Sequence, residues 1–266
     1  MFKTFQTRQL DTLEFLQADD ATADFPPHYH ETFCVSLIEK GVFTENHTIA
    51  IQDSLLVSHP LEVHRNRILP DTRYSLRTFY VSPDVLRFAA QSPKVFRLPK
   101  VVNDPYLVQQ YRALTDRFFG NSANTIADRS FEENFLRLLG GLSAYRQAYT
   151  EAPKEPDWVR EVKTHIMAGI EEKIHLDTLT KIAGLEKYRL VRTFQKHTGL
   201  TPFQFVVLQR VLCGKEMLRQ GKPIVHTAID AGFYDQSNFT NYFRQYIGTT
   251  PKVYQNSCNI FQDQDK

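Results

Sequence analysis

Cysteine is scarce in this chain of 266 residues, which has only three. Cys34, Cys213 and Cys258 are odd in number, widely spaced and never arranged as a Cys-x-x-Cys pair. Disulfide-stapled folds and structural zinc sites both depend on cysteines at short, paired spacings. The sequence therefore argues against both and suits a reducing compartment.

Long apolar runs and recognisable export signals are missing too. No stretch approaches the roughly 18 uninterrupted apolar residues that a transmembrane helix requires. Residues Met1–Gln6 lack the basic-then-apolar pattern of a signal peptide. We therefore expect a cytoplasmic protein that has no membrane partner.

Sequence motifs of common enzyme chemistry are also absent. The chain has no Gly-x-Ser-x-Gly, Walker A, Gly-x-Gly-x-x-Gly or His-Glu-x-x-His pattern. These patterns mark acyl transfer, nucleotide binding and metalloprotease chemistry. We therefore expect that the protein is not an enzyme and carries no cofactor.

Charge is nearly balanced over the whole chain, at +2, but it is unevenly distributed. Residues 1–150 have 16 Lys and Arg against 17 Asp and Glu, whereas residues 173–258 have 12 against 5. A basic C-terminal half indicates a polyanionic partner. The length suits two domains, each large enough to bury its own core.

The hydrophobic period changes along the chain. Between residues 31 and 80, short apolar runs alternate with turn residues, as in a β-sandwich or small β-barrel. From residue 83 onwards the apolar spacing is helical, with helices expected near 104–119 and 130–149. We predict an α+β protein in four parts: a β-rich domain over 1–150, a proline-containing linker over 151–156, an all-α domain over 157–258 and a polar tail over 259–266.

The C-terminal half contains an internal repeat at an offset of 48–49 residues. In each copy a short helix ends at a glycine, Gly184 or Gly232, which supplies the left-handed residue that a helix end needs. A tight turn and a second helix follow, so each copy is a helix-turn-helix unit, and a helix over about 202–219 joins the two. The matched residues that end the units are Phe194, Gly199, Thr201 and Pro202 in the first copy and Phe243, Gly248, Thr250 and Pro251 in the second.

The second helix of each unit has a polar outer face. Leu190 and Phe194 lie four residues apart and face the core together, which leaves the opposite side of the helix for solvent or a partner. Arg and Lys suit guanine edges and phosphates, and Asn and Gln suit adenine edges. The alternative is a small helical domain whose polar face is only solvated, but two matched units in the basic half favour DNA binding. The outward residues are Lys187, Tyr188, Arg189, Val191 and Arg192 in the first unit and Gln236, Ser237, Asn238, Thr240 and Asn241 in the second.

Residues from about 157 to 255 resemble the DNA-binding domain of AraC-type transcription regulators. The resemblance implies seven helices, with two helix-turn-helix units joined by a long helix and two recognition helices in successive major grooves. It places recognition on residues 188, 191 and 192 and on residues 236, 237, 240 and 241. The stretches that carry it are Ala183-Gly184-Leu185, Leu190-x-Arg192-x-Phe194, Ala231-Gly232-Phe233 and Asp235-Gln236-Ser237-x-Phe239.

Two departures from the family pattern bear on the first unit. Glu186 stands where the family has a serine-like cap, and Val191 stands where a polar reader is common. Val191 suits a thymine methyl or makes this unit less selective. We expect Lys187, Arg189 and Arg192 to anchor the first unit on phosphates, and the second unit to read adenines.

The N-terminal half resembles the cupin-like β-barrel that precedes this DNA-binding domain in many AraC-type regulators. His28-Tyr29-His30 comes before the first strong strand, and His64 follows later, as in the cupin pattern. The resemblance implies a small-molecule sensor, with effector-binding residues at His28, His30, Phe33 and His64.

These histidines raise the question of a metal. His28 and His30 are two residues apart on a strand and share one face, so joint ligation is feasible. The glutamate of metal-binding cupins is missing, because Cys34 and Val35 stand at its usual spacing. Three ligands without a fourth lead us to expect no metal. A metal-dependent cupin enzyme is the alternative that metal analysis tests.

The sequence thus predicts a sequence-specific DNA-binding transcription regulator controlled by a small-molecule effector in the N-terminal barrel. The alternative is a ligand-independent regulator whose barrel serves dimerisation or protein contacts. The expected partners are double-stranded DNA, an effector and a second copy of the chain, with RNA polymerase as a further candidate. The helices near 104–119 and 130–149 stand where the family often dimerises, but their apolar stripes fit packing onto the barrel equally well.

Overall fold

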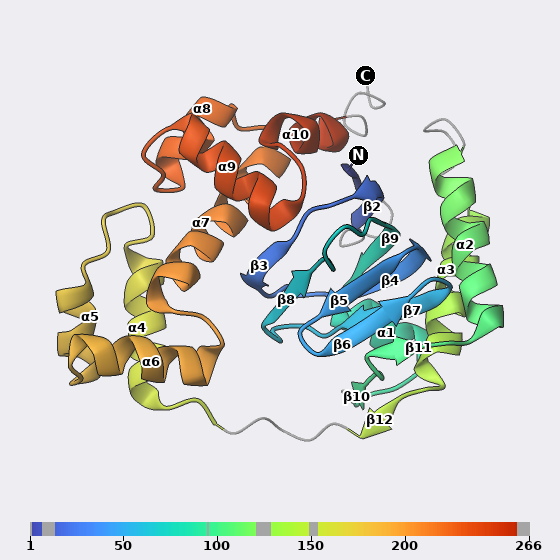
Figure 1. The fold of residues 1–266 in the computed structure, drawn as a ribbon, viewed down its shortest axis with the longest axis horizontal. Helices are drawn as coiled ribbons and strands as arrows, with labels where there is room; N and C mark the ends of the chain where they lie inside the picture. Colours follow the sequence, from blue (N-terminus) through green and yellow to red (C-terminus); the bar gives the residue numbers. More distant parts are fainter. Residues whose placement is uncertain (1, 7–13, 95, 121–128, 149–153, 260–266) are drawn as a thin grey trace.

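The computed structural model describes residues 2–6, 14–94, 96–120, 129–148 and 154–259. A β-rich domain and an all-helical domain lie side by side, as the α+β prediction requires (Figure 1). Among the described helices, none is long and apolar enough to cross a membrane. Residues 154–156 of the predicted linker have no regular structure, while 151–153 and the tail after Asn259 lie outside the described residues.

Two antiparallel sheets face each other in the β-rich domain. The four-stranded sheet has the order β3-β8-β5-β6, with β3 at Phe25–His28, β8 at His64–Arg67, β5 at Val42–Glu45 and β6 at Thr48–Ile51. A separate pair joins β10 (Phe96–Arg97) to β12 (Gln147–Ala148). The six-stranded sheet has the order β1-β2-β9-β4-β7-β11, formed by β1 (Phe2–Gln6), β2 (Glu14–Ala21), β9 (Tyr74–Val81), β4 (Phe33–Lys40), β7 (Ser54–Ser58) and β11 (Val101–Val102).

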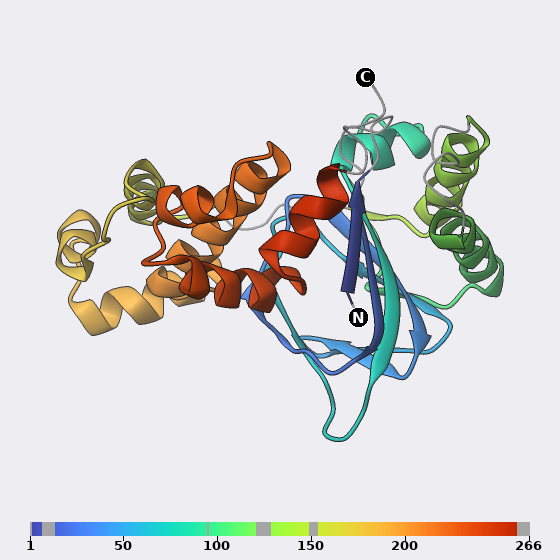
Figure 2. The ribbon, with the colours of Figure 1, turned by 90° about the horizontal axis from the view of Figure 1, so that it is seen from above.

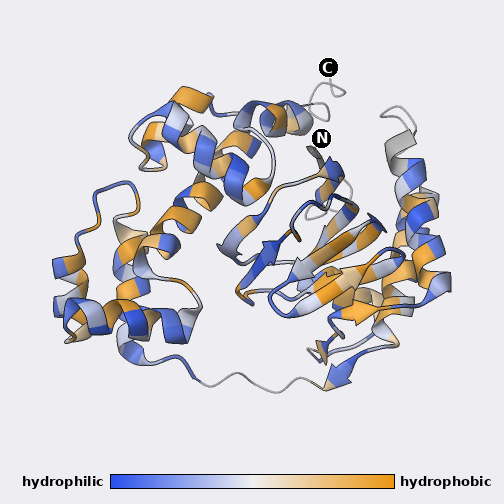
Figure 3. Ribbon diagram, viewed as in Figure 1, coloured by the Kyte–Doolittle hydropathy of each residue, from blue (hydrophilic) through white to orange (hydrophobic). Residues whose placement is uncertain are grey.

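Three helices cover the outer face of the six-stranded sheet: α1 (Pro83–Ala89), α2 (Pro105–Gly120) and α3 (Arg129–Ser143). Their apolar stripes are buried against the sheet in one continuous core (Figure 3). The stripes of α2 and α3 therefore serve packing within the chain and do not by themselves indicate a dimer. Helix α3 ends at Ser143, earlier than the expected residue 149, and residues 147–148 pair with β10 instead.

Tyr111 of α2 fixes these helices to the sheet. Its side chain is fully buried. The hydroxyl lies 2.6 Å from the carbonyl oxygen of Val35 and 2.9 Å from that of Arg77, and it accepts the backbone N–H of Phe79 at 3.1 Å. One hydroxyl thus satisfies backbone groups of two central strands where no water is available.

Seven helices form the C-terminal domain, as the family resemblance implies. Helix-turn-helix geometry appears twice, in α5 with α6 and in α8 with α9, and α7 joins the two units. Gly184, Gly199 and Gly248 end α5, α6 and α9 at φ of 64°, 77° and 83°, in the left-handed region that favours glycine. The helices are α4 (Asp157–Ala168), α5 (Leu176–Ala183), α6 (Lys187–Thr198), α7 (Pro202–Arg219), α8 (Ile224–Asp230), α9 (Gln236–Ile247) and α10 (Pro251–Asn259).

Side-chain caps define where the helices of this domain begin. The Thr201 hydroxyl and the Gln204 side chain form a reciprocal capping box at the start of α7. Asp235 accepts the backbone N–H of Asn238 at 2.7 Å and so caps α9. Glu186 occupies the cap position of α6, but its side chain accepts no capping hydrogen bond.

The two domains touch directly. Gln209 of α7 donates its Nε2 hydrogen to the Tyr29 hydroxyl at 2.6 Å, and Lys215 of α7 pairs with Glu14 of β2 at 2.7 Å. Val63 packs against the core of the helical domain. Helix α10 lies beside β1 (Figures 1 and 2). The N-terminal domain therefore reaches the helix that joins the two helix-turn-helix units.

Candidate functional site: two polar helix faces and a histidine cavity

The outer face of α6 is basic and aromatic. Lys187, Tyr188, Arg189 and Arg192 are all exposed, and the guanidinium carbon of Arg192 lies 5.4 Å from the centre of the Tyr188 ring. This distance allows a cation–π contact that holds both side chains on one surface. The structure thus brings four of the five first-unit residues named above onto one accessible face.

Lys187 already has a partner. Its ammonium lies 2.6 Å from Oδ1 of Asp177 on α5, and this hydrogen bond lowers the pKa of the Asp177 carboxyl. Both side chains are exposed, so water screens the pair and a DNA phosphate can compete with the carboxylate. Lys187 remains suited to a phosphate contact.

Val191 lies apart from this basic face. It is half-buried and lines an apolar groove between α5, α6 and α7, together with Leu179, Pro202 and Val206. Its methyl groups therefore face an apolar groove. This environment favours the alternative in which Val191 makes the first unit less selective for DNA sequence.

The outer face of α9 is polar and uncharged over its first two turns, and exposed Arg244 follows in the last turn. Gln236, Ser237, Asn238 and Asn241 are exposed, and Thr240 is half-buried. The opposite face carries Phe239 and Phe243, which are completely buried. Amide and hydroxyl groups offer both donors and acceptors, as base edges in the major groove require.

Tyr234 was missed by the sequence reasoning. It directly precedes the Asp235 cap and is 91% exposed, more than any other large apolar or aromatic side chain among the described residues. A tyrosine beside the start of a recognition helix can contact the sugar–phosphate backbone with its ring and hydroxyl. The only sequence signal was an aromatic residue in the turn between two helices, where no core position requires one.

The spacing of the two faces suits duplex DNA. The 18 residues of α7 give a length of roughly 27 Å at 1.5 Å per residue. Helices α6 and α9 pack towards opposite ends of α7 (Figure 1). Successive major-groove segments on one side of DNA are about 34 Å apart, which is comparable.

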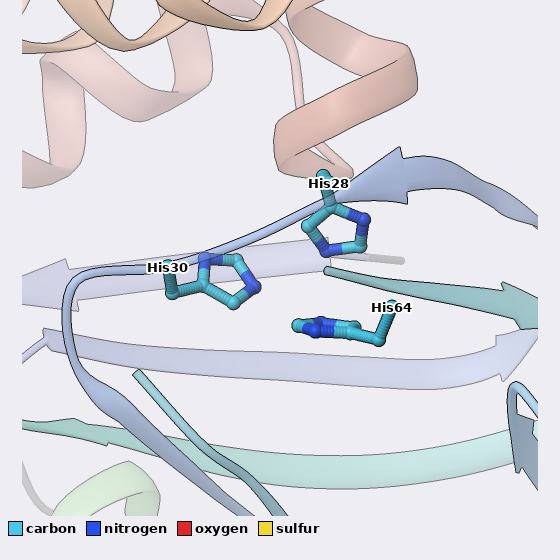
Figure 4. Close-up of side chains that lie close together, drawn as sticks. All are labelled: His28, His30 and His64. Atoms are coloured by element: carbon cyan, nitrogen blue, oxygen red, sulfur yellow. The ribbon is translucent and has the colours of Figure 1, made fainter. Parts of the chain in front are cut away.

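A second polar site lies between the two sheets. His28, His30 and His64 point towards one another there, and one ring nitrogen from each lies within 4.8 Å of the others (Figure 4). They line a cavity of about 50 Å³. Strands β3 and β8 pair through His28 and His64, so sheet register brings together residues that are 36 positions apart. The other polar lining residues are Cys34, Ser36, Glu45, Ser58, Asn66, Tyr74, Thr78, Tyr80 and Tyr246.

Backbone carbonyls set the orientation of two of these rings. Nδ1 of His28 lies 2.7 Å from the carbonyl oxygen of Pro26, and Nδ1 of His64 lies 2.9 Å from that of Glu62. A carbonyl oxygen only accepts hydrogen bonds, so each Nδ1 carries the hydrogen. The lone pair of each ring is therefore on Nε2.

The cavity keeps the imidazoles of His28 and His30 uncharged. Burial lowers the pKa of His28 to about 3, with a further contribution from His64. Burial, followed by the charges of His28 and His64, also lowers the pKa of His30 well below its usual value. At neutral pH both rings are neutral bases.

Glu45 is a site residue that the sequence reasoning did not find. Its side chain is buried, accepts a hydrogen bond from the Ser58 hydroxyl and lies 2.8 Å from the Lys100 ammonium. One carboxylate oxygen lies 3.9 Å from Nε2 of His64. Glu45 comes from a different strand, β5, at a spacing that matches no motif. Only the pairing of β5 with β8 brings it here.

Phe33 does not line this cavity, which corrects its predicted place beside the histidines. Alternate residues of β4 point to opposite faces of the sheet. Cys34 and Ser36 face the cavity, whereas Phe33 packs on the other face with Leu86 and Phe96.

The helical domain contributes to the cavity wall. Tyr246 of α9 is one of the lining residues. In Figure 4, helices of the C-terminal domain pass directly above His28. Tyr29, between the two cavity histidines, bonds to Gln209. The cavity is therefore a site that both domains share.

Comparisons with known proteins match both halves. A family model described as the AraC-like ligand binding domain matches residues 12–139, and one described as a helix-turn-helix domain matches residues 179–257. The uncharacterized HTH-type transcriptional regulator YbfI of Bacillus subtilis is 28% identical over 88% of this chain and 89% of its own length. The HTH-type transcriptional activator RhaS of Escherichia fergusonii is 26% identical over 86% of each chain.

A solved structure shares the two-domain fold. ToxT from Vibrio cholerae O395 superposes with a TM-score of 0.53 at 13% identity, over 97% of this chain and 98% of its own. This likeness concerns the fold alone. The two family matches, the full-length relatives and the paired helix-turn-helix units agree, and the chain belongs to the AraC-type transcription regulators, as a DNA-binding regulator with an N-terminal ligand-binding domain.

Proposed function

We propose that a small molecule bound in the histidine cavity controls how α6 and α9 engage a promoter. The observation that carries this proposal is the shared wall of the cavity. Tyr246 lines the cavity from α9, the helix that presents Asn241 to solvent. A ligand that contacts Tyr246 differently in two domain arrangements would shift the balance between them.

The hydrogen bond of Tyr29 supplies a second connection. Tyr29 lies between His28 and His30, and its hydroxyl accepts a hydrogen bond from Gln209 of α7. Movement of either histidine towards a ligand therefore acts on Tyr29 through the backbone. Because α7 joins both helix-turn-helix units, this contact reaches the two recognition helices together.

For DNA binding, we assign different roles to the two polar faces. Lys187, Arg189 and Arg192 anchor the first unit on phosphates, with Tyr188 held against Arg192. Val191 adds little direct selectivity because it lines the apolar groove. The second unit reads base edges through Gln236, Ser237, Asn238, Thr240 and Asn241.

We further propose a cytoplasmic regulator that acts as a homodimer and contacts RNA polymerase. Phe88 and Tyr106 are 73% and 66% exposed on α1 and α2, the helix layer that faces away from the second sheet. Exposed aromatic side chains are typical of protein interfaces. We assign the cavity a sensing role rather than a catalytic one, because the DNA-binding domain forms part of its wall.

The test begins with the DNA sequence that the protein selects. Full-length protein is incubated with a random duplex pool, and survivors are sequenced. Two short motifs about one helical turn apart are expected if both units enter the major groove. Operator affinity is then measured by fluorescence anisotropy for Tyr29→Phe and for the exposed control Tyr145→Phe, which loses a hydroxyl hydrogen bond to Asp104 within the N-terminal domain.

Loss of the Tyr29 hydroxyl removes one interdomain hydrogen bond, worth about 0.5–1.5 kcal/mol. We expect operator affinity to change roughly twofold to tenfold in Tyr29→Phe and to remain unchanged in Tyr145→Phe. Equal affinities in both variants would favour the alternative, in which the N-terminal domain acts without a ligand and only dimerises or binds another protein.

A further inference from the structure

The apolar groove on the first helix-turn-helix unit lies apart from the histidine cavity. It has a volume of about 490 Å³ and shares no lining residue with that cavity. Its α5 wall lies on the side of the helical domain that faces away from the two sheets (Figure 1). Pockets for small organic ligands typically measure about 300–1,000 Å³, so the groove has the size of a ligand site.

Helical spacing explains why the groove is apolar. Leu176 and Leu179 are three residues apart on α5, and Phe203 and Val206 are three residues apart on α7, so each pair occupies one helix face. Val191 of α6 lines the groove with them. Leu179 and Val206 are buried, whereas Leu176 and Phe203 are 36% and 67% exposed. Two large apolar side chains are thus left open to an apolar occupant.

The internal repeat shows that the helix-turn-helix fold does not require these apolar residues. Both units form the same pair of helices followed by a third. At the 49-residue offset of the repeat, polar residues stand at three of the equivalent positions in the second unit. The three pairs are Val191 and Thr240, Phe203 and Lys252, and Val206 and Gln255.

Two cationic side chains lie at one end of the groove. Arg210 donates Nε–H to the carbonyl oxygen of Ile170 at 2.9 Å and Nη2–H to that of Glu172 at 2.6 Å, which holds it beside Lys173. Within the described ranges, neither cation forms an ion pair with a carboxylate. Arg210 follows Phe203 by seven residues, about 10 Å along α7. The groove therefore has a positive end and an aromatic end.

We propose that this groove binds an amphipathic organic anion, with its carboxylate at Lys173 and Arg210 and its apolar body against Phe203, and that its occupancy is linked to DNA binding. Charge complementarity favours an anion over a neutral ligand, because hydrogen bonds between a guanidinium and a carboxylate are about twice as strong as those between neutral groups. The site belongs to the DNA-binding domain, so the inference goes beyond the function proposed for the histidine cavity.

Val191 supplies the link to DNA binding. It directly precedes Arg192, the exposed residue of α6 that we assign to a phosphate. A ligand packed against Val191 therefore contacts the inner side of the helix whose outer face carries the phosphate anchors. Linkage is reciprocal, so operator DNA and the ligand should change the affinity for each other by the same factor.

The experiment uses full-length protein and the fluorescent anion anilinonaphthalene sulfonate, whose emission rises in apolar surroundings. We expect a saturable rise that phenylbutyrate, an apolar ring and chain with one carboxylate, competes away. Phenylbutanamide keeps the apolar body but is neutral. It should compete at least about tenfold more weakly, because it loses the hydrogen bonds between charged groups. Equal competition by the two compounds would overturn the assignment of an anion.

Substitutions locate the binding to the groove. Phe203→Ser changes an exposed side chain and should weaken phenylbutyrate at least about threefold, with exposed Ile229→Ser in the second unit as the matched control. Lys173→Gln should weaken phenylbutyrate about twofold to fivefold and leave phenylbutanamide unchanged, with exposed Lys181→Gln as its control. Val191→Trp fills the groove and should abolish binding of both compounds. Thermal unfolding shows whether each variant folds.

Equal fluorescence titrations of wild type, Phe203→Ser and a folded Val191→Trp would overturn the groove as the binding site. Wild-type protein without saturable binding would overturn the ligand, and a dimer that Phe203→Ser dissociates in sedimentation would then assign the groove to a second copy of the chain. Phenylbutyrate should change operator affinity at least about twofold in wild type but not in Phe203→Ser. Competitive binding that leaves operator affinity unchanged would support the site and contradict its link to DNA. The Tyr29→Phe experiment decides the role of the histidine cavity independently.

Discussion

Replacing Gly214 with alanine tests how α7 holds the second recognition helix. Gly214 lies in the buried interior of α7. On helix propensity alone, Gly214→Ala should stabilise the protein by about 1 kcal/mol. The structure predicts the opposite. A methyl group at this position would lie 2.7 Å from Cε2 and 2.9 Å from Cζ of Phe239, well inside the roughly 3.5–4.0 Å of a favourable carbon contact.

The Phe239 ring has little room to move aside. It is fully buried, and its centre lies 5.2 Å from the ring of Phe233 and 5.4 Å from that of Phe243. Forcing an extra methyl group into a packed core costs about 1–3 kcal/mol. After the gain in helix propensity, we expect Gly214→Ala to lower the free energy of unfolding by up to about 2 kcal/mol.

Urea unfolding followed by circular dichroism measures this change, and anisotropy measures the effect on operator binding. Because Phe239 and Asn241 lie on the same helix, displacement of α9 should also weaken operator binding. In a Phe239→Leu background, which removes the far edge of the ring, most of the penalty should disappear, and the double-mutant cycle reports the coupling. A Gly214→Ala protein more stable than wild type would refute the packing argument.

Three further predictions concern the residues proposed to contact bases, the residues proposed to contact phosphates, and the buried tyrosine that joins α2 to the six-stranded sheet. Asn241→Ala should reduce the free energy of operator binding by about 1–3 kcal/mol at particular base pairs if the amide contacts an adenine. Lys187→Ala should weaken binding to all DNA sequences alike and reduce the slope of log affinity against log salt concentration by about 1. A uniform loss in both variants, measured by competition with mutated operators, would contradict this division. Asp177→Asn should strengthen operator binding modestly, most clearly at low salt, because it frees Lys187 from its ion pair. Unchanged affinity would mean that Lys187 contacts no phosphate. Tyr111→Phe should lower the free energy of unfolding by about 1–3 kcal/mol, because it leaves buried backbone groups unpaired. An unchanged free energy of unfolding in urea denaturation would show that these groups find other hydrogen-bond partners.

The C-terminal domain was predictable because its signals are local. Gly184 and Gly199 mark helix ends through a left-handed conformation that other residues rarely adopt. Leu190 and Phe194 identify the buried face of α6 through their spacing of four residues. These features depend on a few neighbouring residues, so the sequence alone carries them.

The N-terminal site was only partly predictable because it depends on long-range pairing. The three histidines do meet, as their cupin-like spacing suggested. Glu45 reaches His64 only because β5 pairs with β8 in the observed register, which no spacing rule indicates. The place of Phe33 was wrong by one residue, and in a strand an error of one residue exchanges the two faces of the sheet. Contact between Tyr29 and Gln209, which are 180 residues apart, has no local signal.

The length of α7 also fixes the distance and the rotation between the two helix-turn-helix units. Inserting one residue into it would advance the second unit by 1.5 Å and rotate it by about 100°, which would turn the polar face of α9 away from the groove. Inserting seven residues would nearly restore the rotation but add about 10 Å, close to a third of a turn of DNA. Small insertions in α7 therefore cannot adapt the protein to DNA sites whose two motifs lie at a different distance from each other. The sequence of each motif can evolve while their separation stays constant.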